Sequence, residues 1–125
     1  MKARGFTLIE LLIVVVIIGI LASFAIPKFA NTKQKAYVAQ MKSDLKNLAT
    51  AEEAFFYDST FYTTSLAALN NFRASTGVTL NVLEATPQGW SAEALHAQTT
   101  RRCALYQGNA APVVPATVEG RITCT

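Results

Sequence analysis

Few side chains in this sequence have the types and spacing that catalysis or metal binding requires. The single histidine, His96, falls in an expected strand and has no partner for acid–base work. Asp44, Glu52 and Glu53 fall in one helical stretch, where no further ligand stands at metal spacing. The sequence therefore predicts a chain that is not an enzyme and that needs no metal and no cofactor.

Two cysteines, Cys103 and Cys124, are the next reactive groups. They lie far apart in the sequence and form no C-x-x-C motif, and only His96 could add a nitrogen ligand. This set does not suit zinc. In a domain outside the membrane such a pair favours a disulfide, with two free thiols as the alternative.

One acid stands out by its surroundings. Glu10 lies in an apolar stretch, residues 6–26, whose other interruptions are Thr7, Gly19 and Ser23. A helix of roughly 20 apolar residues can cross a bilayer. A carboxylate inside such a span costs about 2.5–3.5 kcal/mol, so Glu10 requires a functional reason.

The apolar run by itself leaves alternatives open. A secretory signal peptide needs a small-residue cleavage site after the run, which Ala22, Ser23 and Ala25 could provide. An ordinary single-pass anchor is a second alternative. Charge does not decide the orientation, because Lys2 and Arg4 precede the run and further lysines follow it. The cysteine pair favours an external C-terminal domain.

The charge balance argues against a polyanion binder. The net charge is +3, and two of the eleven cationic residues lie in the first five positions. The remaining chain is nearly neutral and has no basic stripe interleaved with aromatic residues. Nucleic acid is therefore expected only as an indirect partner.

The hydrophobic pattern changes its period along the chain. Between residues 37 and 55 apolar side chains recur every three or four positions, with Glu52 as the exception, which predicts one helix over about residues 6–56. Strand patterns follow, so we expect an α+β fold in which a small antiparallel sheet packs on the long helix. The expected elements are a short helix at 65–72 with Ser65 as its N-cap, and strands at 78–82, 90–96, 101–107 and 118–124.

The N-terminal residues carry a family resemblance. Residues 5–11 read GFTLIEL, follow a short basic leader and open the apolar run. This resembles the type III signal sequence of type IV prepilins and pseudopilins, and the match covers roughly the first quarter of the chain. The resemblance implies that a prepilin peptidase cuts between Gly5 and Phe6 and that the new amine of Phe6 is methylated.

The same resemblance implies a division of the chain and roles for single residues. Residues 1–5 would be the removed leader, 6–27 the membrane and filament-core half of the helix, and 28–125 an external pilin domain. Glu10 would meet the Phe6 amine of a neighbouring subunit, with a simple helix-dipole role as the alternative. Gly19 and Pro27 would bracket a segment that loses helical hydrogen bonding in the filament. Cys103 and Cys124 resemble the pair that closes the C-terminal loop of many pilins.

The resemblance predicts a structural subunit, the major pilin of a type IV pilus. Its partners would be further pilin subunits, the prepilin peptidase, the assembly machinery of the inner membrane and, before assembly, the membrane itself. The precursor would lie in the inner membrane and the mature chain in an extracellular filament. Motility, adhesion and DNA uptake are activities of such filaments, and the sequence does not choose among them.

Three alternatives remain. A type II secretion pseudopilin usually carries clustered acids for calcium near the C-terminus, whereas Glu119 is the only acid after Glu93 here. A minor pilin that contacts DNA has only the Arg101–Arg102 pair in its favour. An unrelated single-pass binding protein would leave the GFTLIEL start unexplained.

Overall fold

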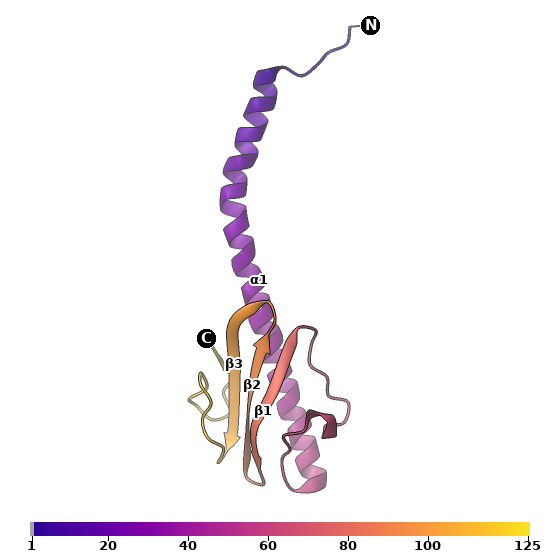
Figure 1. The fold of residues 1–125 in the computed structure, drawn as a ribbon, viewed down its shortest axis with the longest axis vertical. Helices are drawn as coiled ribbons and strands as arrows, with labels where there is room; N and C mark the ends of the chain where they lie inside the picture. The colour runs from indigo at the N-terminus through magenta and orange to yellow at the C-terminus, as the bar shows by residue number, and fades with distance from the viewer. Residues whose placement is uncertain (1) are drawn as a thin grey trace. The chain divides into compact units, whose positions relative to one another are not determined.

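The chain folds as one long helix followed by a small antiparallel sheet. The structure is a computed structural model that describes residues 2–125. Helix α1 covers Leu8–Ser59, and the 3₁₀ helix η1 covers Leu66–Ala68 (Figure 1). The chain divides into two compact units, Met1–Gln34 and Lys35–Thr125, and α1 contributes to both. The element order confirms the predicted α+β class.

The part of α1 in the first unit is apolar on every side. Each large apolar side chain from Leu8 to Phe29 is at least 49% exposed. The run includes consecutive β-branched residues at 14–18, which are weak helix formers in water. In lipid a helix is favoured because it satisfies every backbone N–H within the segment. By length and composition α1 contains one stretch that could cross a membrane.

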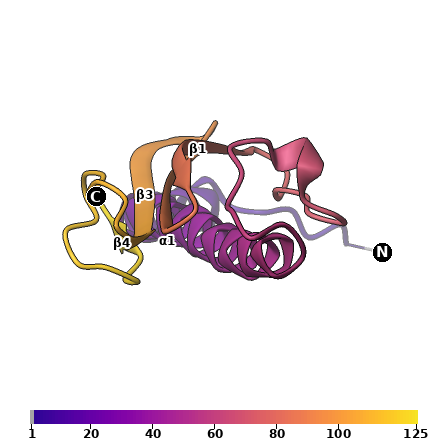
Figure 2. The same ribbon diagram turned by 90° about the horizontal axis from the view of Figure 1, so that it is seen from below.

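The part of α1 in the second unit is amphipathic. Met41, Leu45 and Leu48 are completely buried and belong to one hydrophobic core with residues of the sheet. In Figure 2 the strands lie on one side of this part of the helix, and the other side is uncovered. The three- and four-residue spacing of the buried side chains explains why only one face packs.

The sheet is a meander in which sequential strands pair antiparallel in the order β1-β2-β3-β4. Along β2 the alternate residues Trp90, Ala92, Ala94 and His96 are all buried, as a strand with one inward face requires. The strands are β1 at Val78–Thr86, β2 at Gly89–His96, β3 at Thr99–Gly108 and β4 at Thr123–Cys124.

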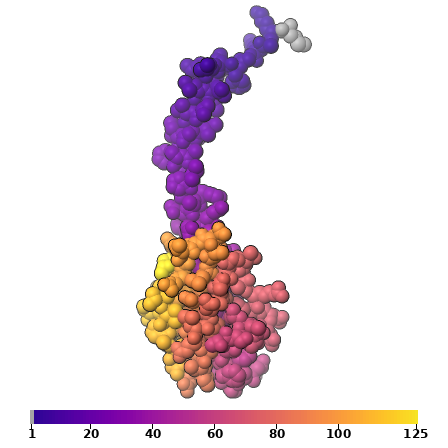
Figure 3. All heavy atoms as spheres, in the orientation of Figure 1, coloured from indigo at the N-terminus to yellow at the C-terminus, as the bar shows by residue number. Residues whose placement is uncertain are grey.

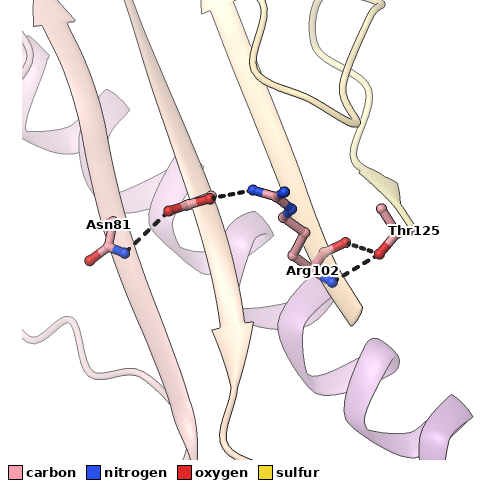
Figure 4. A network of polar contacts seen from close by, with 4 residues as sticks. Asn81, Arg102 and Thr125 are labelled. Carbon is pink, nitrogen blue, oxygen red and sulfur yellow. Dashed lines mark hydrogen bonds and ion pairs between the residues drawn. The ribbon is translucent and has the colours of Figure 1, made fainter. Parts of the chain in front are cut away.

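A chain of polar contacts crosses the outer face of the sheet. Asn81 Nδ2 donates to Glu93 Oε1 at 3.4 Å, and Arg102 lies 3.7 Å from Glu93 Oε2. Arg102 N donates to Thr125 Oγ1 at 3.1 Å, which attaches the C-terminal residue to β3 (Figure 4). Exposed pairs of this kind stabilise by about 0–1 kcal/mol, so their main effect is to align neighbouring strands.

Two predicted elements are shorter in the structure than the sequence indicated. The helix expected at 65–72 is only η1, because the chain is already extended at Leu69, and Ser65 makes no side-chain cap hydrogen bond. The strand expected at 118–124 is reduced to Thr123–Cys124. Its first residues form turns instead: Gly120 has a φ of 71°, and Arg121 N donates to Val118 O at 3.2 Å.

Two buried carboxylates on α1 attach the connecting segment, residues 60–77. Asp44 accepts from both the backbone N and the Oγ of Ser75, each at 2.8 Å. Glu52 accepts from Thr63 N at 3.1 Å, while its Oε1 is buried without a hydrogen-bond partner among residues 2–125. Both acids therefore have a structural role, since they satisfy backbone donors that no strand satisfies.

Glu52 should make the stability of the second unit depend on pH. Burial raises the pKa of Glu52 above its usual value of 4.5. Its contribution to stability is therefore full at or below that value and is lost as pH rises toward the raised pKa, by at most about 1.4 kcal/mol per pH unit. Glu52→Gln should remove this slope in thermal unfolding of the full chain in detergent, followed by near-ultraviolet circular dichroism between pH 4 and 8.

The matched control for that experiment is Asp58→Asn, which removes an exposed carboxylate from the same helix. This control should keep the slope of the unmodified chain. A Glu52→Gln chain that retains the slope would show that another group titrates on unfolding.

Candidate functional site

The first turn of α1 is closed by Thr7 and Glu10. The helix begins at Leu8, so Thr7 is the N-cap residue and Glu10 is the third helical residue. Glu10 N donates to Thr7 Oγ1 at 3.3 Å, and Thr7 N donates to Glu10 Oε2 at 2.8 Å. This reciprocal arrangement is a capping box, which satisfies two backbone donors that the helix itself cannot satisfy.

The capping box occupies only one oxygen of the carboxylate. The Thr7 hydroxyl also donates to Glu10 Oε2, at 2.8 Å. Glu10 Oε1 has no hydrogen-bond partner within the described part of the chain. The carboxylate is thus held in place by its own turn and retains an acceptor for a donor from another molecule.

The residues before the helix form an accessible segment. Gly5 and Phe6 lie outside regular structure, and the Phe6 side chain is 88% exposed. A Cβ built on Gly5 would meet nothing within 4 Å. An enzyme could therefore reach the peptide bond between the two residues without unfolding the helix.

Gly19 and Pro27 lie inside α1, which continues through both. A Cβ at Gly19 would meet no atom within 4 Å, so packing within this chain does not require glycine there. Pro27 has no N–H and cannot donate to the carbonyl of Ser23. The segment is helical in the single chain, and its loss of helix in a filament stays a prediction.

Cys103 and Cys124 form a disulfide across neighbouring strands. The two residues are direct partners in the register of β3 and β4. β4 has only two residues, so the disulfide is the main covalent restraint on the C-terminal segment. Such a disulfide persists in an oxidising environment.

His96 takes a structural position. Its ring stacks on Tyr37 with the centroids 4.3 Å apart, and its Nδ1 accepts from Gln98 N at 3.0 Å. An accepting Nδ1 leaves the proton on Nε2, which lies 3.1 Å from Gln40 Oε1. Within residues 2–125, no group of three or more His, Cys, Asp or Glu side chains is placed to hold a metal ion.

Three polar residues have structural roles that the sequence did not predict. The capping role of Thr7 was not predicted, although the pattern T-x-x-E directly before an apolar run indicates a capping box. Glu52 could have been identified because it interrupts an apolar stripe. The bond from Asp44 to Ser75 has no comparable signal, because it joins residues 31 positions apart.

The comparisons with known proteins agree with these features. Residues 1–26 match the family model described as the prokaryotic N-terminal methylation motif. The type IV major pilin protein PilA of Myxococcus xanthus is 50% identical over 61 residues, which are 49% of this chain and 28% of PilA. The type IV major fimbrial protein FimA of Dichelobacter nodosus is 47% identical over 55 residues, 44% of this chain and 35% of FimA.

A further relative comes from protein secretion. The type II secretion system core protein G of Escherichia coli is 39% identical over 70 residues, 56% of this chain and 48% of that protein. The chain spans less than half the length of each of these three relatives.

Residues 1–26, which include the capping box and most of the apolar part of α1, carry the prokaryotic N-terminal methylation motif. Over about half of its length, this chain is similar to the two type IV major pilin proteins.

Proposed function

We propose that this chain is the major structural subunit of a type IV pilus. The observation that carries the proposal is the first turn of α1, where Glu10 is held by Thr7 at the start of a helix that is apolar on every side. Such a helix needs lipid before assembly and like helices afterwards. The printed name of the Myxococcus relative, a type IV major pilin, supports the same role.

Processing at the accessible segment would prepare the chain for assembly. A prepilin peptidase of the inner membrane would cut between Gly5 and Phe6, and the new amine of Phe6 would be methylated. Removal of Lys2 and Arg4 is required because each charge would cost several kcal/mol in a dry helix bundle. The mature chain would begin directly before the capping residue Thr7.

Assembly would then pair opposite charges in the filament core. The free Oε1 of Glu10 is the acceptor that the Phe6 ammonium of a neighbouring subunit would use. In a medium without water an unpaired charge is strongly unfavourable, so this pair would set the register of each added subunit. The filament would leave the inner membrane through an assembly machinery and extend from the cell surface.

A second candidate function is that of a type II secretion pseudopilin. The match to core protein G of Escherichia coli covers more of this chain than the match to PilA does. Against this candidate, Glu119 stands alone near the C-terminus, and its Oε1 accepts from Gly108 N at 2.8 Å. A calcium site of the kind expected in major pseudopilins needs several acidic ligands.

Intact mass spectrometry of filaments sheared from the cell surface tests the proposed function. We expect this chain to dominate the filaments, to lack residues 1–5, and to carry one methyl group and one disulfide. A processed chain that stays in the membrane fraction and is absent from the filaments would favour the pseudopilin or minor-pilin function instead.

A further inference from the structure

The exposed charges of α1 in the second unit are cationic in its N-terminal part and acidic toward its end. Lys42 and Lys46 lie on the N-terminal side, and Glu53 and Asp58 lie toward the end of the helix. All four residues are exposed. Lys42 and Lys46 are four residues apart and share one face, which forms a cationic stretch, whereas Glu53 and Asp58 are five residues apart and point to different flanks of an acidic helix end.

The cationic stretch borders a groove that it forms with the C-terminal segment. This segment, yellow in Figure 3, lies along one flank of the folded domain. Two adjoining hollows of about 570 Å³ and about 540 Å³ share Lys42, Arg121 and Ile122. Lys46 lines the first hollow and Arg101 the second, and no Asp or Glu side chain lines either. We call this feature the cationic groove.

The cationic side chains around the groove make no ion pair with any of residues 2–125. The ion pair between Arg102 and Glu93 is the one present among residues 2–125. The side chains of Lys46, Arg121 and Asp58 therefore make no ion pair in the single chain. Glu53 accepts one hydrogen bond, from the Tyr62 hydroxyl at 2.9 Å, which leaves its second oxygen free.

We propose that the cationic groove binds the acidic end of α1, around Glu53 and Asp58, from a second copy of this chain. The inference rests on the proposed filament function, because it requires copies that assemble side by side. Each copy carries both complementary groups, and the chain without residues 1–5, with nine cationic and eight acidic residues, has a net charge of only +1, which gives no general attraction for polyanions. A second copy is therefore the occupant that the charge distribution favours.

The arrangement of the two copies follows from the helix geometry. Copies that assemble side by side in the proposed filament would have the second-unit parts of their α1 helices parallel. The cationic and acidic positions are separated by 7 residues, from Lys46 to Glu53, up to 16 residues, from Lys42 to Asp58. At about 1.5 Å per residue the second copy is displaced along the helix by about 10–24 Å.

Zero-length cross-linking tests the contact directly. Within one α1, Lys46 and Asp58 are 12 residues apart, about 18 Å, so a carbodiimide cannot join them in the same chain. We expect carbodiimide treatment of filaments and membranes to join Lys46 to Asp58 between copies, detected by mass spectrometry of the linked peptides. The control Lys46→Arg keeps the charge but lacks the amine, so it should assemble normally and lose the link.

Charge reversal with rescue gives a second measurement. Lys46→Glu and Asp58→Lys should each lower the yield of sheared filaments at least about tenfold, and the double variant should restore most of it. Asp58→Lys places a cation in the last turn of α1, so it does not destabilise the helix. Gln98→Glu, an added acid in the exposed turn between β2 and β3, should leave the yield unchanged.

The outcomes separate this inference from the proposed function. Filaments that form normally without the link and tolerate both reversals would overturn the contact and leave the pilus function in place. Linked copies in membranes that never yield filaments would keep the contact and overturn the pilus function. Reversals that abolish DNA binding while assembly stays normal would assign the groove to a polyanion and overturn the proposal.

Discussion

Glu10→Ala should leave membrane insertion and leader removal intact while surface filaments fall by at least about a hundredfold. The physical reason is that removal of one member of a buried charge pair costs about 3–5 kcal/mol, because the partner charge remains without compensation. In the assembled core the partner would be the ammonium of Phe6 in a neighbouring copy. The measurement combines immunoblots of the processed chain in membranes with quantification of sheared filaments.

Two further variants separate the charge of Glu10 from its role in the capping box. Glu10→Gln retains an oxygen that can accept from Thr7 N but has no charge, so it should be nearly as defective as alanine. Thr7→Ala removes the hydroxyl that bonds Glu10 but keeps the carboxylate, and should cost only about 0.5–2 kcal/mol of helix stability. Filaments at the normal level from Glu10→Ala would refute the pairing role.

Removal of the disulfide should produce the largest loss of stability in the folded unit. The chain-entropy model assigns about 3 kcal/mol to a bridge between residues 21 positions apart. The double variant Cys103→Ala with Cys124→Ala should lower the free energy of unfolding by about that amount, measured by urea denaturation of the full chain in detergent. The fluorescence of the buried Trp90 reports the transition.

The loss should be concentrated in the C-terminal segment. Gly120 N donates to Tyr106 O at 2.9 Å, and Thr125 N donates to Arg102 O at 3.0 Å. Both amides should exchange hydrogen much faster in the double variant than in the oxidised chain. Thr125→Val is the matched control, because it removes the hydroxyl contact to β3 but keeps the bridge. Equal urea midpoints for the oxidised chain and the double variant would contradict the predicted stabilisation.

The two large predictions concern separate parts of the function. Glu10 acts in the apolar segment, where a charge is tolerated only with a partner. The disulfide acts in the second unit, where it holds the residues that line the cationic groove. A disulfide-free chain should therefore weaken the groove contact while its apolar helix stays unchanged.

Much of this protein was determined by local patterns in its sequence. The apolar run predicted the membrane-length segment, the three- and four-residue spacing between residues 37 and 55 predicted the long helix, and the strand patterns that follow predicted the sheet. These features depend on side chains close in sequence, where hydrophobic spacing alone decides which face is buried. The strand expected at 90–96 was correct for the same reason, since it falls within β2, Gly89–His96.

Other features were decided only by tertiary structure. The strand expected at 118–124 is reduced to β4 because residues 118–121 form a turn, with Gly120 at a φ of 71° and Arg121 N bonded to Val118 O. The buried Asp44 is satisfied by Ser75, and the cationic groove joins Lys42 to Arg121. The hydrogen bonds between Asp44 and Ser75 and this groove join residues that are far apart in the sequence. They depend on how the C-terminal part of the chain packs against α1, and no periodic pattern in the sequence predicts that packing.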